Sequence, residues 1–331
     1  MILSEADNLI VGGSDVNCVR MNQFFIYEAT ASANSLSFLD NGSSAHKLIG
    51  TVNSAKLKGS LTIPSSHNSS SFGGTAKPVN RLENEALSFQ RELTTVVIPS
   101  SVTTIGELVF YNCSALENIT IPSSVTSIGN TAFSATNLKG VTIPDSVTVI
   151  ANSLFMGSKI DTVTLGDSVT SIQANAFSNC SKLTSITIPD SVTSIGDSAF
   201  QRCTSLNSLT IPDGVTSIGV NTFNRCSNLS SINIPDGVTN IGGHAFRNCS
   251  SLTTITIPDS ITQIGPSAFR DCTSLSRINC LATTPPTMGN GAFSSVAFDT
   301  NGFQSIHVPA SASSAYGSVF AGLTVVADLS G

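Results

Sequence analysis

The sequence predicts a repeat solenoid, mainly β with short helical turns, built around one long parallel sheet. An Ile-Pro pair recurs at intervals of 22 or 23 residues from Ile98 to Ile257, with Leu165 filling the one missing place. A fixed period in this range is typical of solenoids. A phenylalanine returns at the same period from Phe110 to Phe269. From these recurrences we expect about 11 rungs, each packing on its neighbours.

Each rung is expected to begin with a strand that ends at the Ile-Pro pair. In one rung Leu209 and Ile211 are apolar and Thr210 stands between them. This alternation places the apolar residues in the core and the threonine on the outer face of the sheet. Threonine suits an exposed strand position because it is β-branched and carries a polar group. Proline then ends the strand because it has no N–H for the next rung.

The second half of each rung is expected to turn, extend briefly and turn again. Asp190 follows the proline and is expected to cap the turn through its side chain. Val192 and Ile195 are expected to face inward from a second extended stretch, and Gly196 to permit a tight turn. After this turn the chain returns to the next strand through Phe200. The phenylalanines of successive rungs are expected to form a buried stack of phenyl rings.

The ends of the chain depart from the repeat and suggest three regions. Residues 1–45 form an N-terminal β cap or an attachment module, because short apolar stretches alternate with glycine-rich turns. Residues 46–309 form the solenoid, with a Ser- and Gly-rich insertion near residues 65–77. Residues 310–331 form a C-terminal cap with a short helix and a last strand.

Composition excludes several classes of function. Charged residues are only 11% of the chain, and the formal charge is −6. Nucleic acids need clustered Lys and Arg, so no nucleic-acid partner is predicted. No apolar run is long enough to span a membrane. The opening MILSEADNLI has no basic region followed by an apolar run, so no secretory signal is predicted there.

The repeat also carries a family resemblance. The pattern LxxIxIPxxVxxIGxxAFxxCxxL, over roughly residues 46–309, is similar to the leucine-rich repeats of the BspA type, found in bacterial surface proteins and some parasitic protists. It implies a right-handed leucine-rich-repeat superhelix and adhesion to large partners. The units around Ala135 and Gly157 depart from it by lacking the cysteine. The stretch VGGSDVNCVRMNQFFIYEA bears a weak resemblance to short β modules of phage tail and virion proteins.

The residues with reactive side chains do not form a site. Six cysteines stand three places after the phenylalanine: Cys113, Cys180, Cys203, Cys226, Cys249 and Cys272. A straight file of parallel side chains suits neither disulfide geometry nor a metal with four ligands, so buried thiols are expected. The turn aspartates lack the grouped carboxylates that calcium needs. The histidines fall at unrelated places, and their spacing supports no Ser-His-Asp grouping. We therefore predict no enzyme, metal site or cofactor.

The outward polar file remains as a candidate binding surface for a cell-surface protein or glycan. The eight candidate residues are Thr164, Thr187, Asn207, Thr210, Ser230, Asn233, Thr253 and Thr256. Ser208, Ser231 and Thr254 are expected on the same face. Exposed strands also need β-branched polar residues for purely structural reasons, and regular threonine files suit ice binding. Without tryptophan the face lacks obvious anchors for a protein partner.

Two functional hypotheses follow. The first is a non-enzymatic adhesion protein on the cell surface or outside the cell. The alternative is a phage virion component, in the tail or on the capsid, whose residues 1–45 contact other virion proteins while the repeats recognise the host. A structural spacer is a third interpretation.

Overall fold

A computed structural model describes residues 7–11, 14–21, 24–29, 36–39, 46–51, 57–67, 77–297 and 304–329. These fall into two units, residues 1–148 (unit 1) and residues 149–331 (unit 2), which are taken separately below. Both consist of repeated turns that form a β-solenoid of about 11 turns in all, as predicted. The three-region division of the chain stays a prediction.

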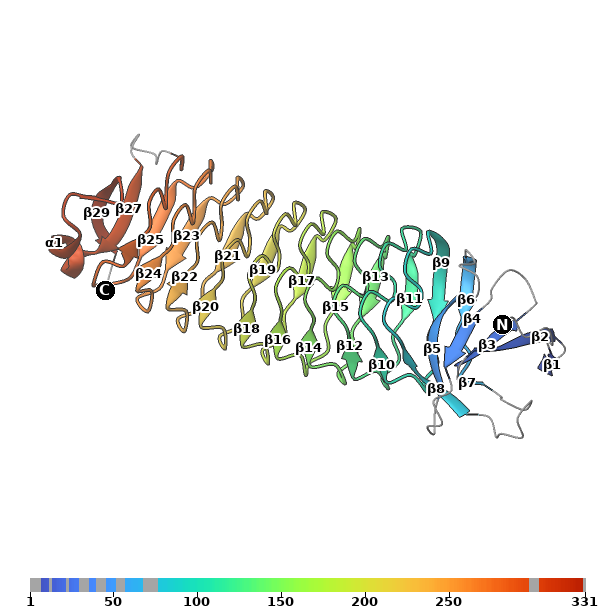
Figure 1. Cartoon of the computed structure of the whole chain (residues 1–331). Coiled ribbons are helices and arrows are strands. Elements are labelled where there is room, and N and C mark those ends of the chain that lie inside the picture. Colours follow the sequence, from blue (N-terminus) through green and yellow to red (C-terminus); the bar gives the residue numbers. More distant parts are fainter. Residues whose placement is uncertain are drawn as a thin grey trace. The chain divides into compact units, whose positions relative to one another are not determined.

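Unit 1 begins with an antiparallel sheet. Its strands are β1 (Asp7–Val11), β2 (Ser14–Met21) and β3 (Phe24–Ala29), in the order β1-β2-β3 (Figure 1). β4 (Leu36–Leu39) pairs antiparallel with β5 (His46–Thr51), and β5 pairs parallel with a later strand, β8 (Lys77–Leu82). The boundary predicted between residues 45 and 46 therefore separates two paired strands. Whether residues 1–45 cap the solenoid or attach it to another body stays a prediction.

The repeats of unit 1 contribute two further series of parallel strands. One contains β6 (Lys58–Thr62), β9 (Glu92–Val97) and β11 (Asn118–Thr120), and the other continues from β8 through β10 (Thr104–Ile105) to β12 (Ser127–Ile128). β13 (Gly140–Thr142) is the last strand of this unit. β7 (Ser66–His67) pairs antiparallel with β8, and residues 68–76 of the predicted insertion lie outside the described residues.

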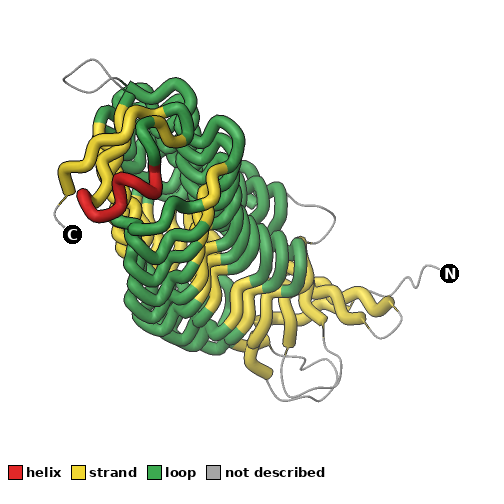
Figure 2. The backbone as a smooth tube through the Cα atoms, turned by 90° about the vertical axis from the view of Figure 1, so that its left-hand side faces the viewer, coloured by secondary structure: helices red, strands yellow, loops and turns green. Residues whose placement is uncertain are grey.

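Unit 2 carries the most regular rungs, each with one face strand and one shorter back strand (Figure 1). The face strands are β15 (Thr162–Thr164), β17 (Ser185–Thr187), β19 (Ser208–Thr210), β21 (Ser231–Asn233), β23 (Thr254–Ile257), β25 (Arg277–Cys280), β27 (Ser305–Pro309) and β29 (Leu323–Leu329). The back strands are β14 (Val149–Ile150), β16 (Ser171–Ile172), β18 (Ser194–Ile195), β20 (Ser217–Ile218), β22 (Asn240–Ile241), β24 (Gln263–Ile264) and β26 (Thr287–Met288). Seen from the C-terminal side in Figure 2, the strands of successive rungs lie behind one another.

The face strands form a succession of short parallel sheets where one long sheet was expected. β15 pairs with β17, β19 with β21, and β23 with β25, each in register. Between these pairs the rungs remain joined by backbone hydrogen bonds outside the face strands, such as Asn207 N–H to the Thr184 carbonyl at 3.2 Å and Phe177 N–H to the Ala199 carbonyl at 2.8 Å. Most of these strands have only three residues, so one lengthened hydrogen bond interrupts the regular ladder.

The predicted inward and outward positions are confirmed in unit 2. Leu209 and Ile211 are 5% and 1% exposed, and Thr210 between them is exposed. The face strand therefore follows the two-residue period of a half-buried strand. Around the back strand, Val192 and Ile195 are buried, and Thr193 and Ser194 between them are exposed.

The phenylalanine stack is confirmed as the centre of the core. From Phe155 to Phe293, consecutive ring centroids lie 4.9 to 5.6 Å apart, with interplanar angles of 4° to 11°. From Phe155 to Phe269, each phenylalanine N–H donates to a carbonyl of the next rung; that of Phe223 reaches the Ala245 carbonyl at 2.8 Å. The rings are fully buried, so the stack combines burial of apolar surface with ring-to-ring contact.

The recurring glycine has a different role from the one expected. Gly196 was predicted to permit a tight turn, but its φ is not positive. A Cβ placed there would lie 2.6 Å from the Ala174 nitrogen of the preceding rung. At Gly242 the corresponding distance to the Val220 nitrogen is 2.7 Å. Glycine is needed because adjacent rungs approach each other closely at this point.

The C-terminal residues form a short helix and a last strand, as predicted. A 3₁₀ turn at Ala310–Ala312 leads into α1 (Ser313–Tyr316), and β28 (Val319–Phe320) pairs antiparallel with β29. The Tyr316 hydroxyl is buried against the last rungs and donates to the Ala282 carbonyl at 2.8 Å.

We predict that Phe223→Ala lowers the free energy of unfolding by about 3–5 kcal/mol, because it opens a cavity within the ring stack. Urea unfolding measures this change. The control is Val220→Ala, at a side chain that is 43% exposed, where a change within about 0.5 kcal/mol is expected. A loss below about 1 kcal/mol for Phe223→Ala would show that the stack does not support the core.

Candidate ligand-binding face

All eight candidate residues are exposed on one side of unit 2. Five of them occupy the outward position of consecutive face strands: Thr164, Thr187, Thr210, Asn233 and Thr256. The pairing aligns them, since Thr164 is opposite Thr187 and Thr210 is opposite Asn233. The other three, Asn207, Ser230 and Thr253, come just before a strand.

A groove of about 610 Å³ crosses this face from β17 to β23. Four predicted residues line it: Thr187, Thr210, Asn233 and Thr256. Thr164, Asn207, Ser230 and Thr253 are not among its lining residues. Ser208, Ser231 and Thr254, expected on the same face, also line it, and Ser185 was missed. The signal for Ser185 was available, since it stands two places before Thr187 and so shares its side of the strand.

The groove lining is about equally polar and apolar and carries no formal charge. Its lining comprises serine and threonine hydroxyls, one asparagine amide, and the edges of Ile186, Ile188, Leu209 and Ile232. Hydroxyl and amide groups both donate and accept hydrogen bonds. No carboxylate, imidazole or amine lines the groove, so nothing there activates a serine as a nucleophile. The arrangement suits hydrogen bonding along an extended partner better than catalysis.

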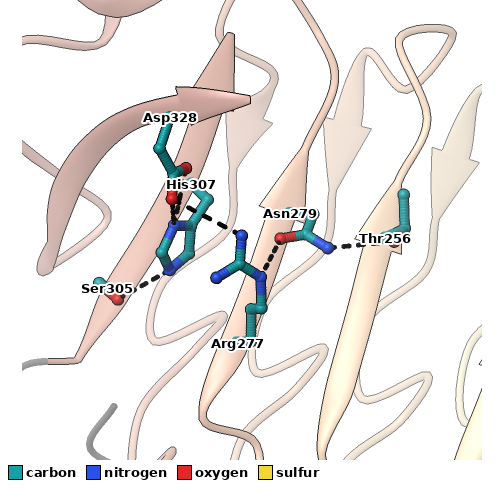
Figure 3. A network of polar contacts seen from close by, with 6 residues as sticks. All are labelled: Thr256, Arg277, Asn279, Ser305, His307 and Asp328. Atoms are coloured by element: carbon teal, nitrogen blue, oxygen red, sulfur yellow. Dashed lines mark hydrogen bonds and ion pairs between the residues drawn. The ribbon is translucent and has the colours of Figure 1, made fainter. Parts of the chain in front are cut away.

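Beyond the groove, a network of charged and polar groups continues the row of outward polar side chains (Figure 3). Asn279 on β25 donates to the Thr256 hydroxyl at 3.5 Å and accepts from Arg277 Nε at 2.9 Å. A terminal nitrogen of Arg277 lies 3.6 Å from Asp328 Oδ2 on β29. Both members of this ion pair are more than 40% exposed, so the pair adds little stability.

The same network contains a Ser-His-Asp series that the sequence spacing did not reveal. His307 Nδ1 lies 2.9 Å from Asp328, and its Nε2 lies 3.3 Å from Ser305 Oγ (Figure 3). A nucleophilic serine must reach a substrate, whereas Ser305 is 3% exposed and the groove does not extend to it. The contacts join β27 to β29, and we assign them to holding the last strands together.

The cysteine file is confirmed as a set of buried thiols. Six of the described cysteines follow the phenylalanine, and all six are free and 0% exposed. Each thiol donates to a backbone carbonyl in the preceding rung; that of Cys226 reaches the Phe200 carbonyl at 3.1 Å. Cys203 and Cys249 make the same contact with Phe177 and Phe223. The thiols therefore satisfy buried carbonyl groups, a role that the spacing alone did not indicate.

The turn aspartates do not cap their turns as expected. In unit 2, Asp190, Asp213, Asp236 and Asp259 are exposed, and their carboxylates make no hydrogen bond to any described residue. The backbone closes the turn, with Val192 N–H donating to the Pro189 carbonyl at 3.0 Å. Ser191 Oγ secures it by donating to the Val169 carbonyl of the preceding rung at 2.6 Å.

Neither a metal centre nor a membrane span is found in the described part of the chain. No three His, Cys, Asp or Glu side chains gather within it in a way that would hold an ion. None of its helices has the length and apolar character needed to cross a bilayer.

The buried thiols predict a loss of stability at alkaline pH. Burial raises the pKa of Cys226 and of Cys272 from 9.0 to about 12. Above pH 9 the unfolded chain releases these protons while the folded chain keeps them. Stability is therefore intact below pH 9 and falls as the pH rises toward 12, by about 1.4 kcal/mol per pH unit for each thiol.

Urea unfolding between pH 8 and 10.5 measures this slope. In the matched variant Cys226→Ser, the slope above pH 9 is expected to be shallower by about 1.4 kcal/mol per pH unit, since one titrating group is gone. Equal slopes for both proteins would contradict the assignment.

Comparison with known proteins agrees with this architecture. The family model for the BspA type leucine rich repeat region matches residues 80–207 and 193–327, more than half of the chain. A search of curated proteins found no match.

Several solved structures are similar to this chain. A leucine rich cell surface protein from Faecalibacterium prausnitzii A2-165 has 26% identity and a TM-score of 0.46, over 86% of this chain and 94% of its own. A leucine-rich repeat protein from Bacteroides ovatus ATCC 8483 has 24% identity and a TM-score of 0.38, over 91% and 99%. The leucine rich repeat protein of T. pallidum has 25% identity and a TM-score of 0.47, over 68% and 90%. On the evidence of its family-model match, the chain belongs to the BspA type leucine-rich-repeat family.

Proposed function

We propose that the chain is a non-enzymatic adhesion protein acting at a cell surface, and that the groove across β17 to β23 binds an uncharged polysaccharide. The observation that carries the proposal is the groove lining, which offers hydroxyl and amide groups on four successive rungs and no formal charge. The family supports a surface role, because BspA type repeats occur in surface proteins.

The groove chemistry favours a polysaccharide over a protein partner. Protein interfaces depend on a few large apolar or aromatic anchors. The large apolar side chains that stand exposed in the described residues, such as Val220 and Leu281, are not in the groove. Sugars present many hydroxyl groups, which both donate and accept, as the lining side chains do.

Binding to such a face is expected to be weak at each rung and to accumulate along the polymer. Each rung repeats nearly the same pair of outward residues, such as Ser208 with Thr210 and Ser231 with Asn233. A polymer with a repeating unit can engage several rungs at once, so its avidity exceeds the affinity for one unit. The expected partner is therefore a chain and not a single sugar.

Affinity electrophoresis of the full chain in gels that contain dextran, mannan or xylan tests the proposal. We expect at least one of these uncharged polymers to retard the protein. The triple variant Thr187→Lys, Thr210→Lys and Thr256→Lys should lose at least about tenfold in affinity, because lysine removes the hydroxyls and fills the groove.

The matched control carries three threonine-to-lysine changes just before the back strands β18, β20 and β22: Thr193→Lys, Thr216→Lys and Thr239→Lys. These residues are also exposed threonines but do not line the groove. The control should be retarded like the original chain, and both variants should unfold at the original temperature. Equal retardation of all three proteins, or none for the original chain in any of the gels, would overturn the proposal.

A further inference from the structure

Four arginines occupy one turn in four successive rungs of unit 2, one or two places after the phenylalanine of each rung. They are Arg202, Arg225, Arg247 and Arg270, and they are half of the eight arginines in the chain. Arg202, Arg225 and Arg270 are exposed and Arg247 is half-buried. We call these four residues the arginine ridge.

Backbone hydrogen bonds bring the members of the ridge together. Arg225 N–H donates to the Arg247 carbonyl at 2.7 Å, and Arg202 N–H donates to the Asn224 carbonyl, also at 2.7 Å. The ring stack beneath them spaces these rungs by 5.1 to 5.6 Å. The ridge therefore presents one guanidinium for about every 5 Å of solenoid.

Such a row of like charges is unfavourable unless something neutralises it, because neighbouring cations on stacked rungs repel one another. Within the described residues, only Asp271 neutralises part of this charge. Its Oδ2 lies 3.6 Å from Arg247 Nε and 3.5 Å from Arg270 Nε. These separations exceed hydrogen-bond length. Arg202 and Arg225 make no ion pair with any described side chain. The ridge thus keeps unused charge and unused donors.

Carboxamides alternate with the arginines. Gln201 precedes Arg202, Asn224 precedes Arg225, and Asn248 follows Arg247, so three rungs each offer one guanidinium and one amide. In addition, Asn224 Oδ1 and Arg247 Nε are shielded from solvent and lack a hydrogen-bond partner. A ligand that suits the ridge carries anionic groups together with hydrogen-bond donors.

We propose that the arginine ridge binds a linear acidic polysaccharide. The planar guanidinium group pairs two of its N–H donors with the oxygens of a carboxylate or sulfate, which favours arginine over lysine for this task. The sugar hydroxyls would meet the interleaved amides. The ridge lies on the turn after the ring stack and does not line the groove, so this site is independent of the proposed function.

Two other anionic partners fit less well. Single-stranded nucleic acid needs aromatic side chains on which bases stack, and no exposed aromatic side chain lies in this turn of the four ridge rungs. A second copy of the chain would offer the exposed Asp190, Asp213, Asp236 and Asp259, which recur at the same rung spacing. Those carboxylates only accept hydrogen bonds and leave the amide acceptors of the ridge without donors.

The test is elution of the full chain from immobilised heparin with increasing sodium chloride. The ridge variant carries Arg202→Asn, Arg225→Asn, Arg247→Gln and Arg270→Gln, because Asn248 and Gln201 already occupy the corresponding positions of the repeat. The control variant carries Lys58→Gln, Lys139→Gln, Lys159→Gln and Lys182→Gln, which changes the net charge by the same amount away from the ridge.

We expect the original chain and the control variant to be retained, and the ridge variant to lose at least about tenfold in affinity with an unchanged unfolding temperature. Soluble polygalacturonate and dextran sulfate, used as competitors, show whether carboxylate or sulfate groups are recognised. The triple lysine variant of the groove should stay on heparin, which separates this site from the proposed polysaccharide groove.

Equal retention of the ridge and control variants would overturn the proposal. So would displacement by single-stranded DNA at lower concentration than by either acidic polysaccharide. A third contradicting result is salt-sensitive self-association in sedimentation velocity, removed by changing the four aspartates to asparagine, together with no retention on heparin. That result would assign the ridge to a second copy of the chain.

Discussion

The rest of this structure depends on hydrogen bonding between equivalent backbone positions of successive rungs. Phe200 N–H donates to the Thr222 carbonyl, Phe223 N–H to Ala245, and Phe246 N–H to Ala268, each within 2.9 Å. Because equivalent positions repeat about every 5 Å, every side chain must tolerate a near copy of itself above and below. Phenylalanine, cysteine, threonine and isoleucine do so by stacking, and a charged residue does so poorly.

This constraint explains both the composition and the distribution of charge. Only 11% of the residues are charged, and the groove face from β17 to β23 has none among its lining residues. The same constraint requires glycine where the backbones of adjacent rungs nearly touch, as at Gly196. It also gives each cysteine a carbonyl of the preceding rung as its hydrogen-bond acceptor. The arginine ridge departs from this pattern because it concentrates charge in one row, and it therefore suggests a binding partner of opposite charge.

Much of the fold followed from the period alone, because a repeated rung constrains each position many times over. The strands, the ring stack, the buried thiols and the outward threonines were all predictable in this way. The reason for Gly196 was misjudged, since the distance between neighbouring backbones cannot be read from one rung. The turn aspartates were misjudged because the backbone and Ser191 already close the turn.

The candidate sites were less predictable because they depend on breaks in the period. Ser305, His307 and Asp328 meet only because β29 pairs with β27 after an irregular connection. The repeat pattern does not reveal the arginine ridge, because Arg202 and Arg225 stand one place further from the phenylalanine than Arg247 and Arg270 do. The groove involves two outward residues per strand, and both were predictable on β19, β21 and β23 because each strand alternates inward and outward positions.

The central claim is that rung-to-rung stacking holds unit 2 together and thereby displays its outer surfaces. Amide hydrogen exchange followed residue by residue tests it most directly. The account predicts that the amides of Phe200, Phe223 and Phe246 exchange slowest and at similar rates, because each is buried and bonded to the next rung. Rapid exchange at these three amides, at the rate of the exposed residues Asp213 and Asp236, would contradict it.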